Sequence, residues 1–150
     1  MLKFFKLRAD AQIPLSATRG SVGYDLVATH ISKRENDVIY FGTGLVVIPP
    51  EGFYTEIVPR SSIAKLREGD HCFLQANSIG IIDADYRGEL IVPLRYVSYG
   101  NTSEPPTGES LIGTRIAQIL VKRIETPEVE EVFAFELTER GAGGFGSTGR

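Results

Sequence analysis

The sequence is poor in the residues that build metal sites, disulfides and membrane spans. It has one cysteine, Cys72, one methionine, two histidines and no tryptophan. A single thiol excludes an internal disulfide and suits a reducing compartment. His30, His71 and Cys72 do not form a zinc-binding pattern. No apolar run is long enough to span a bilayer, and residues 1–7 are too short and too charged for a signal peptide. We therefore expect a cytoplasmic protein with no membrane partner, or a nuclear one if the source is eukaryotic or viral.

Excess positive charge is also absent. The 150 residues carry a formal net charge of −3, which argues against a protein whose main partner is a nucleic acid. The length suits one domain with a sizeable core. Neither an internal repeat nor an interdomain linker is visible, so we expect a single domain.

Helical periodicity is scarce as well. Short apolar or alternating runs separated by Gly, Pro and Asn predict an all-β protein, either a sandwich or a closed barrel. One short helix is predicted over residues 61–66, where serine stands at the start. The predicted strands cover residues 4–7, 23–28, 38–41, 45–48, 53–58, 115–124 and 132–135.

The stretch over residues 77–88 concentrates the polar chemistry of the chain. It begins with an amide, passes through a short apolar run, and then places two carboxylates, a phenol and a guanidinium before a glycine. With the apolar run over residues 89–94 it predicts strand, tight turn and strand. Such a hairpin would offer backbone N–H and C=O groups to a planar ligand. The same residue types also make an ordinary polar turn, and that alternative stays open on this stretch alone.

The C-terminal segment differs from the rest of the chain. Residues 140–150 are mostly glycine, with one aromatic residue, two arginines and a Ser-Thr pair. Glycine-rich chain has no fixed shape of its own, so the segment is either a frayed end or a flexible lid. It is not a P-loop, because the Gly-Lys-Ser/Thr ending is missing. We expect a barrel over residues 1–139 and a lid over residues 140–150.

Taken together, five short motifs resemble those of the trimeric-type dUTPases, in the order of that family and over nearly the whole chain. Each motif is weak alone, and five in register are a strong indication. They are Gly23-Tyr24-Asp25-Leu26-Val27-Ala28, Pro59-Arg60-Ser61-Ser62, residues 80–88, Arg115-Ile116-Ala117-Gln118, and residues 140–149 with Gly-Gly-Phe-Gly-Ser-Thr-Gly. The resemblance implies a jelly-roll-like β-barrel and hydrolysis of dUTP to dUMP and pyrophosphate. That reaction limits uracil incorporation into DNA and supplies dUMP for thymidylate synthesis.

The resemblance also implies roles for the polar residues around the triphosphate. Asp83 matches the general base that activates water for in-line attack on the α-phosphorus. Asp25 matches a carboxylate that holds Mg²⁺ through water, and the ion offsets the triphosphate charge. The phosphate-binding residues matched are Arg60, Ser61, Ser62 and Gln118. Simple helix capping and a buried amide are the structural alternatives for these four.

Nucleoside selection is implied by a second group. In the family, hairpin backbone around Gly80 and Ile82 reads the polar edge of uracil, together with a side-chain amide that Asn77 matches. A site with buried donors and acceptors rejects ligands that leave them unpaired. Tyr86 matches the aromatic ring that lies under the deoxyribose and excludes a 2′-hydroxyl. Half-buried packing is the alternative for Tyr86.

The tail motif implies closure over the substrate. Phe145 matches the residue that covers uracil, and Arg140, Gly146, Ser147 and Thr148 match the phosphate-binding part of the lid. The family builds each site from three subunits, so the resemblance implies a homotrimer. Thr114 departs from the family, which usually has an acidic residue there. Residues 66–73 form a longer segment than expected, which we interpret as an extended loop.

Two other functions are alternatives to that of a dUTPase. Deoxycytidine triphosphate deaminases share the fold and an Arg-Ser-Ser motif, but they need a glutamate ten positions beyond the residue that matches Asp83. That position is Pro93. A binding or regulatory protein that has lost turnover is the other rival, and the presence of Asp25, Asp83, Tyr86 and the tail motif argues against it.

Overall fold

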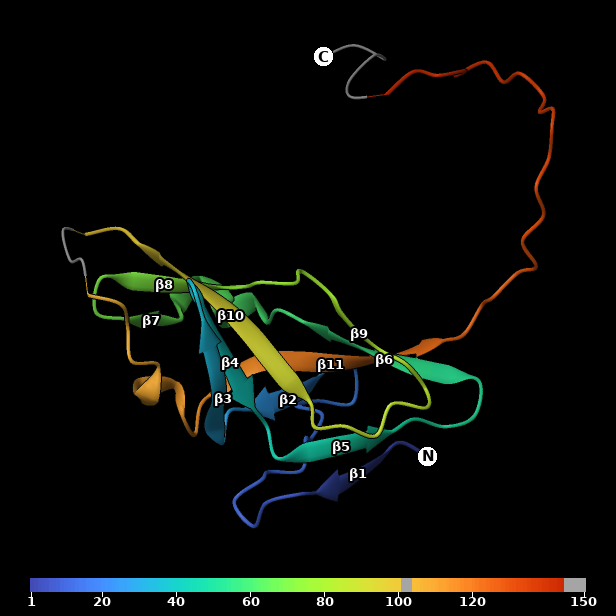
Figure 1. Cartoon of the computed structure of the whole chain (residues 1–150). Coiled ribbons are helices and arrows are strands. Elements are labelled where there is room, and N and C mark those ends of the chain that lie inside the picture. The colour runs from blue at the N-terminus through green and yellow to red at the C-terminus, as the bar shows by residue number, and fades with distance from the viewer. Residues whose placement is uncertain (101–103, 145–150) are drawn as a thin grey trace.

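The computed structural model describes residues 1–100 and 104–144, and these form an almost entirely β structure (Figure 1). One sheet has five strands in the order β3-β4-β10-β8-β7. The other has four strands in the order β2-β11-β6-β9, and β1 pairs with β5 in a separate ribbon. The strands are β1 Lys3–Lys6, β2 Tyr24–Val27, β3 His30–Glu35, β4 Val38–Gly42, β5 Leu45–Ile48, β6 Phe53–Val58, β7 Arg67–Glu68, β8 His71–Gln75, β9 Gly80–Ile82, β10 Ile91–Ser98 and β11 Arg115–Arg123.

A single hydrophobic core lies between the two larger sheets. Phe41, Phe73 and Leu94 come from the five-stranded sheet, and Leu26 and Ile119 come from the four-stranded sheet. Each of these side chains is fully buried. Alternation of apolar and polar residues along the strands explains the arrangement, because successive side chains point to opposite faces of a sheet. The predicted all-β class is confirmed.

Strand predictions were most accurate for runs that are strongly apolar or that alternate. The run over residues 53–58 is β6, and the runs predicted at 38–41, 45–48 and 115–124 differ from β4, β5 and β11 by at most one residue. β3 was missed because its sequence, HISKRE, is mostly polar. Residues 66–73, predicted as an extended loop, instead contain the hairpin of β7 and β8. Gly69 supplies the positive φ, 55°, in its turn.

The predicted hairpin of residues 77–94 is wrong. β9 pairs with β6, whereas β10 pairs with β4 and β8, so the two strands lie in different sheets. The connection between them is too long for a tight hairpin, and it is bound to another part of the chain. The Leu90 N–H donates to Leu45 O at 2.8 Å, and the Thr43 N–H donates to Leu90 O at 3.2 Å. The polar stretch therefore crosses from one sheet to the other.

The helix prediction was right in place and short length. Residues Ser61–Lys65 form a 3₁₀ helix, η1, and a second, η2, spans Glu109–Leu111. Within the described residues no helix is long and apolar enough to cross a membrane.

The predicted strand at residues 132–135 is wrong for this single chain. After β11 the chain leaves the body as an extended arm, residues 125–144, which curves back above the molecule (Figure 1). A strand needs a neighbouring strand to satisfy its backbone groups, and the arm has none in this chain. The division at residue 139 between barrel and lid stays a prediction.

Candidate functional site

The sheet β2-β11-β6-β9 positions most of the predicted site residues. Asp25 lies on β2 and Gln118 on β11, and the two are paired in the ladder. Gln118 is also paired with Val58 at the end of β6, directly before the segment that carries Arg60. Gly80 and Ile82 lie on β9 at the opposite edge of this sheet from β2. Distant parts of the sequence are thus held on one surface by strand pairing.

Asp25 is the centre of a part-buried ionic cluster. Arg60 donates from Nε to Asp25 Oδ1 at 2.6 Å and from Nη2 to Oδ2 at 3.3 Å. Arg115 donates from Nη1 to Asp25 Oδ2 at 3.3 Å. Arg60 Nη1 also donates to Ser62 Oγ at 2.8 Å, which joins the start of η1 to the cluster. One carboxylate between two guanidinium groups leaves net positive charge, which suits an anionic ligand.

Gln118 is held next to this cluster by backbone contacts. Its Nε2 donates to Pro59 O at 3.0 Å. A Cβ at Gly23 would lie 2.1 Å from Gln118 Oε1, so a larger residue there would displace this amide. The buried-amide alternative is thus supported for Nε2. Oε1 faces the glycine backbone, and the side chain stays half-buried at the sheet surface.

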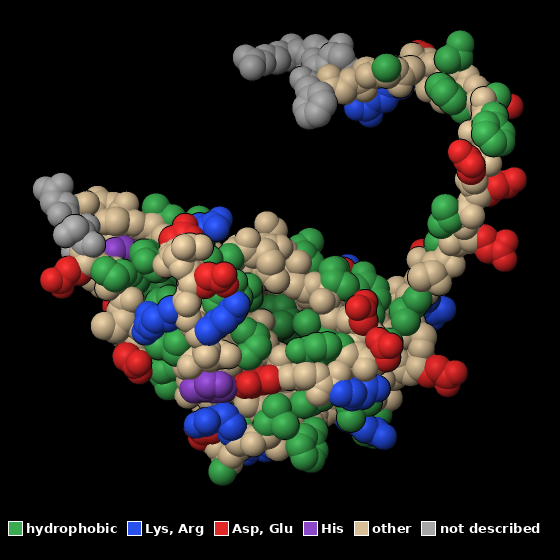
Figure 2. All heavy atoms as spheres, viewed as in Figure 1, with side chains coloured by type: hydrophobic (Ala, Val, Ile, Leu, Met, Phe, Trp, Pro, Cys, Tyr) green, Lys and Arg blue, Asp and Glu red, His purple; other side chains and the backbone are tan. Residues whose placement is uncertain are grey.

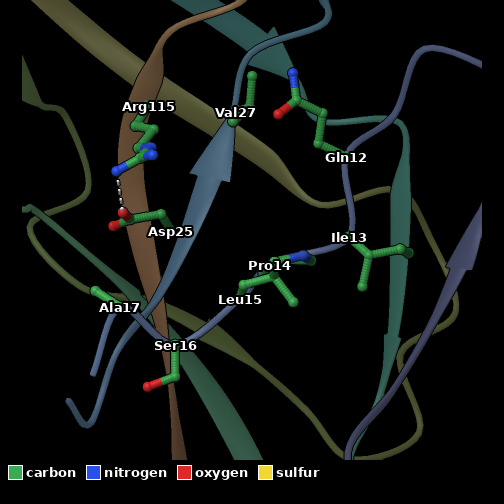
Figure 3. Close-up of a pocket in the computed structure, with 9 residues that line it drawn as sticks. All are labelled: Gln12, Ile13, Pro14, Leu15, Ser16, Ala17, Asp25, Val27 and Arg115. Carbon is green, nitrogen blue, oxygen red and sulfur yellow. Dashed lines mark hydrogen bonds and ion pairs between the residues drawn. The ribbon is translucent and has the colours of Figure 1, made fainter. Parts of the chain in front are cut away.

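A cavity of about 340 Å³ opens beside Asp25 (Figure 3). Asp25 and Arg115 point toward each other at one side, and residues 12–17 cross the opposite side. The Ser16 backbone bridges to Tyr24, which keeps this loop against β2. The cavity gives the ionic cluster access from solvent.

The second group of predicted residues surrounds β9. Gly80 is buried and pairs with Ile57, whereas Asn77 is exposed just before the strand. Gln75, buried at the end of β8, donates from Nε2 to Ile57 O at 2.9 Å and to Asn77 Oδ1 at 3.0 Å. The amide of Asn77 is therefore held at the surface by a buried side chain.

The turn after β9 carries Asp83 and Tyr86. The Tyr86 N–H donates to Asp83 O at 3.1 Å, and Arg87 Nη1 donates to Ala84 O at 2.8 Å, so the turn has internal support. Tyr86 Oη donates to Glu89 O at 3.2 Å. A Cβ at Gly88 would lie only 2.1 Å from Tyr86 Oη. Tyr86 nonetheless remains 44% exposed, which leaves one side of its ring free to meet a ligand.

A second cavity, of about 480 Å³, lies beside Asp83. Ile81 and Ala84 contribute apolar surface, and Tyr54 stands at its edge. Tyr54 Oη donates to Glu56 Oε1 at 2.7 Å, and this hydrogen bond raises the pKa of the phenol above its usual range. Tyr54 is therefore neutral near pH 7. Asp83 is exposed at the cavity and free to meet water.

The structure does not bring Asp83 to Asp25 within one chain. They belong to opposite edges of a four-stranded sheet, and the register places Asp83 four residues further along the strand direction. With about 4.8 Å between strands and about 3.3 Å per residue, their Cα atoms lie on the order of 20 Å apart. The predicted site residues therefore form two groups in the single chain, one at Asp25 and one at Asn77 and Asp83.

The predicted lid residues lie at the end of the arm. Arg140 Nε donates to Gly143 O at 3.0 Å, and Gly141 has a positive φ of 49°, so the described part makes a local turn. Arg140 contacts neither group of site residues in this chain. Phe145, Gly146, Ser147 and Thr148 lie outside the described residues.

Metal-ligating side chains are not clustered in the part of the chain that the structure describes: no group of three His, Cys, Asp or Glu residues could hold an ion. Mg²⁺ is usually held by one or two carboxylates together with waters and substrate phosphates. Asp25, a solvent-accessible carboxylate beside a cavity, fits that arrangement. It does not fit a cage made of protein ligands alone.

Two residues at these groups were missed as candidates. Arg115 belongs to a motif that was recognised, but its contact with Asp25 spans 90 positions in sequence. Gln75 lies two residues before Asn77, and residues two apart in an extended chain share a face. That spacing was the available sign, and only the fold shows that the two amides meet.

The fold is a two-sheet β structure that carries two groups of polar residues on one sheet, and comparison with known proteins identifies the family. The dUTPase family model matches residues 9–149. The chain belongs to the dUTPase family, and the jelly-roll-type prediction is confirmed with it. The family also contains longer members, such as the mitochondrial human relative, which is 37% identical and of which the chain covers 55%.

Relatives and solved structures agree over nearly the whole chain. The probable deoxyuridine 5′-triphosphate nucleotidohydrolase of Schizosaccharomyces pombe is 40% identical over 152 residues, covering 99% of both chains. The enzyme of that name from Leptospira interrogans is 41% identical over 150 residues, covering 96% of this chain and 95% of the relative. The dUTPase of Staphylococcus bacteriophage 80alpha, solved with dUPNHPP, has a TM-score of 0.72 and 25% identity, covering 100% of this chain and 99% of that one.

Proposed function

We propose that this protein is a homotrimeric dUTP diphosphatase that hydrolyses dUTP to dUMP and pyrophosphate. The observation that carries the proposal is the pair of polar groups on one sheet, one suited to phosphates and the other to a uracil ring and an attacking water. Relatives at about 40% identity that are named for this reaction support the substrate.

The Asp25 cluster is the proposed triphosphate site. Arg60 and Arg115 supply charge-assisted donors, and Ser61 and Ser62 add hydroxyl groups at the start of η1. Gln118 completes this side. Mg²⁺, held by Asp25 through water and by the phosphates, would offset the negative charge that develops on the leaving pyrophosphate.

The β9 group is the proposed nucleoside site and reaction centre. The backbone at Gly80 and Ile82, with the Asn77 amide, would pair with uracil, and the exposed ring face of Tyr86 would lie under the deoxyribose. Asp83 would accept a proton from water as that water attacks the α-phosphorus. The bond from this phosphorus to the oxygen bridging to the β-phosphate breaks, and pyrophosphate leaves with that oxygen.

The separation of the two groups supports sites shared between subunits. Reacting atoms must approach to about 3–3.5 Å, so two carboxylates on the order of 20 Å apart in one chain cannot serve one triphosphate. If Asp83 of one subunit faces Asp25 of another, the site is complete. The described surface of one chain would then contribute to two sites.

The arm supports the same assembly. Val129, Phe133, Phe135 and Leu137 are 85–98% exposed, and the space-filling view shows hydrophobic side chains along the arm, which stands clear of the body (Figure 2). Exposed apolar residues in such a row indicate an interface with another molecule. Residues 125–144 can span up to about 65 Å, enough to reach a neighbouring subunit and carry Arg140 and the lid to its site.

Pro93 separates this proposal from the deaminase alternative. The residue is buried in β10, opposite Tyr40 of β4, and a proline side chain has no group that can exchange a proton. Location in the cytoplasm remains a prediction.

The test is one assay of dUTP turnover with two readouts, run with Mg²⁺ and again with excess chelator. Release of pyrophosphate without ammonia supports the proposal. Ammonia would identify a deaminase, and tight dUTP binding without either product would identify a binding protein. A solution mass of three chains is expected, and a monomer with full activity would contradict the shared site.

A further inference from the structure

A buried side chain, Gln75, is hydrogen-bonded both to the backbone and to an exposed amide. The side-chain NH₂ group has two N–H donors. One donates to Ile57 O at 2.9 Å and the other to Asn77 Oδ1 at 3.0 Å. Both donors are therefore used.

The chemistry of the backbone partner sets the direction of this chain of hydrogen bonds. Ile57 O is a carbonyl oxygen and can only accept, so the Gln75 atom that faces it must be the nitrogen. The same nitrogen meets Asn77, so the Asn77 atom that faces it must be the oxygen. The NH₂ group of Asn77 is then the end that remains for a ligand.

The position of this NH₂ group agrees with that assignment. Asn77 Nδ2 lies 3.0 Å from the point where a Cβ at Gly80 would stand, so it sits above the glycine backbone at the start of β9. The turn that places it there has Ser78 at a positive φ of 58°. Gln75 is 8% exposed, whereas Asn77 is exposed at the surface. A core residue thus fixes the orientation of a surface amide.

We propose that Gln75 is a positioning residue for base selection, because it holds Asn77 as a hydrogen-bond donor toward the ligand. This inference rests on the proposed dUTPase function. Uracil carries an acceptor oxygen at position 4, where cytosine carries an amino donor. A fixed donor at Asn77 pairs with uracil and opposes cytosine. An amide that can rotate would offer its oxygen to cytosine instead.

The first test is Gln75→Leu, which keeps a buried side chain of similar size and removes the two donors. The kcat/KM for dUTP should fall about 3- to 10-fold, the scale of one hydrogen bond. The kcat/KM for dCTP, measured at high enzyme concentration, should stay unchanged or rise. The effect on dUTP should be larger in KM than in kcat, because Asp83 is untouched.

Asn77→Asp is the second variant, and its exposed position removes the risk of misfolding. It keeps an oxygen for Gln75 and replaces the outward donor by an acceptor. The kcat/KM for dUTP should fall roughly 10²-fold, which is much more than the fall in kcat/KM for dCTP. If the oxygen of Asn77 normally faced the ligand, the substitution would keep that acceptor, and the preference for dUTP would persist. That result would overturn the inference.

Thr55→Val is the matched control. Thr55 lies on β6 and, like Gln75, is a buried polar residue. Its Oγ1 has no hydrogen-bond partner among the described residues. This variant should leave the dUTP to dCTP ratio unchanged. If Gln75→Leu lowers kcat/KM for dUTP and for dCTP equally, and its melting temperature falls in proportion, Gln75 only stabilises the core and the inference is wrong. If the unaltered protein does not hydrolyse dUTP, the proposed function fails first.

Discussion

The body and the arm of this protein use the same kinds of residue in opposite ways. Phe41 and Phe73 of the body have no exposed surface, whereas Phe133 and Phe135 of the arm are 93% and 85% exposed. The apolar residues of the body alternate along strands that have partners, and those of the arm alternate along a segment without one. Burial in the body thus coincides with the presence of a partner strand, and the described part of the chain offers no such strand to the arm.

The polar chemistry divides in a similar way. Asp25, Arg60 and Arg115 of the body contact one another and form an ionic cluster within the chain. Among the described residues, Arg140 of the arm is bound only to its own turn. We infer that the body supplies preformed groups and that the arm supplies groups that become ordered on binding. Five experiments test this difference between the body and the arm.

The largest effect is expected from Asp83→Asn in the body. The side chain keeps its size and loses the ability to accept a proton, so turnover of dUTP should fall by roughly 10² to 10⁴. Nucleotide binding and melting temperature should stay close to those of the unaltered protein. Steady-state kinetics and calorimetric binding of dUMP check this, and near-normal turnover would refute Asp83 as the base.

Two truncations separate the contribution of residues 140–150 from that of residues 125–139. Removal of residues 140–150 should abolish most activity while melting temperature and oligomer mass change little, because the hydrogen bonds of the described residues 140–144 stay within the arm. Removal of residues 125–150 should also dissociate the trimer, because the exposed apolar row is lost. Light scattering and dUTP turnover on both proteins test this. Normal activity after the shorter truncation would contradict the lid.

A matched pair of phenylalanine substitutions compares burial directly. Phe41→Ala should destabilise the fold by about 3–5 kcal/mol through lost apolar burial and a residual cavity. Phe135→Ala should leave unfolding of the monomer within about 0.5 kcal/mol of the original, as expected for an exposed site. Its effect should appear as weaker assembly. Urea unfolding at several protein concentrations separates the two, and equal destabilisation at high dilution would show that the arm packs on its own body.

Tyr86→Ala tests the sugar side of the body site. The ring should exclude a 2′-hydroxyl by contact, so its removal should narrow the preference for dUTP over UTP by about tenfold. The fold should survive, because the ring is half-exposed and its hydroxyl makes one backbone contact. The ratio of kcat/KM values is the measurement. An unchanged ratio would assign Tyr86 to packing alone.

The smallest effect is expected at Glu68, which ties the body to a surface loop. Burial disfavours its charge, but donors from Ser110, Gly108 and Thr107 outweigh burial and hold the pKa of Glu68 below its ordinary value of 4.5. The folded pKa is lower than the unfolded one, so this carboxylate stabilises the fold above about pH 4.5, and the contribution disappears as pH falls through the folded pKa.

Glu68→Gln should therefore be less stable than the original at pH 7, and the difference should shrink as the pH falls below about 4.5. Chemical unfolding at pH 7 and pH 3.5 gives the comparison. Arg34 donates to the backbone of the same loop at Pro106, so the loop keeps a second tie in the variant. If the difference in unfolding free energy between the two proteins is the same at pH 7 and pH 3.5, the Glu68 carboxylate is not the source of this stabilisation.

Much of this protein was determined by the sequence itself. Period-two alternation predicted β6 and, in part, β11, and short apolar runs located β4 and β5, because both patterns are local properties of the chain. Motif order indicated the family and named Asp25, Arg60, Gln118, Asn77 and Asp83 as candidates. Glycine content distinguished the tail. Each of these features can be recognised from residues close together in sequence.

Only the tertiary structure decided which segments meet. Local alternation gave no reason to pair β9 with β6 rather than with β10, because an apolar strand fits several edges equally well. The contacts of Arg115 with Asp25 and of Gln75 with Ile57 O join residues that are distant along the chain. The apolar pattern of the arm led to the wrong prediction of a strand at residues 132–135, because the described part of the chain has no strand paired with this segment.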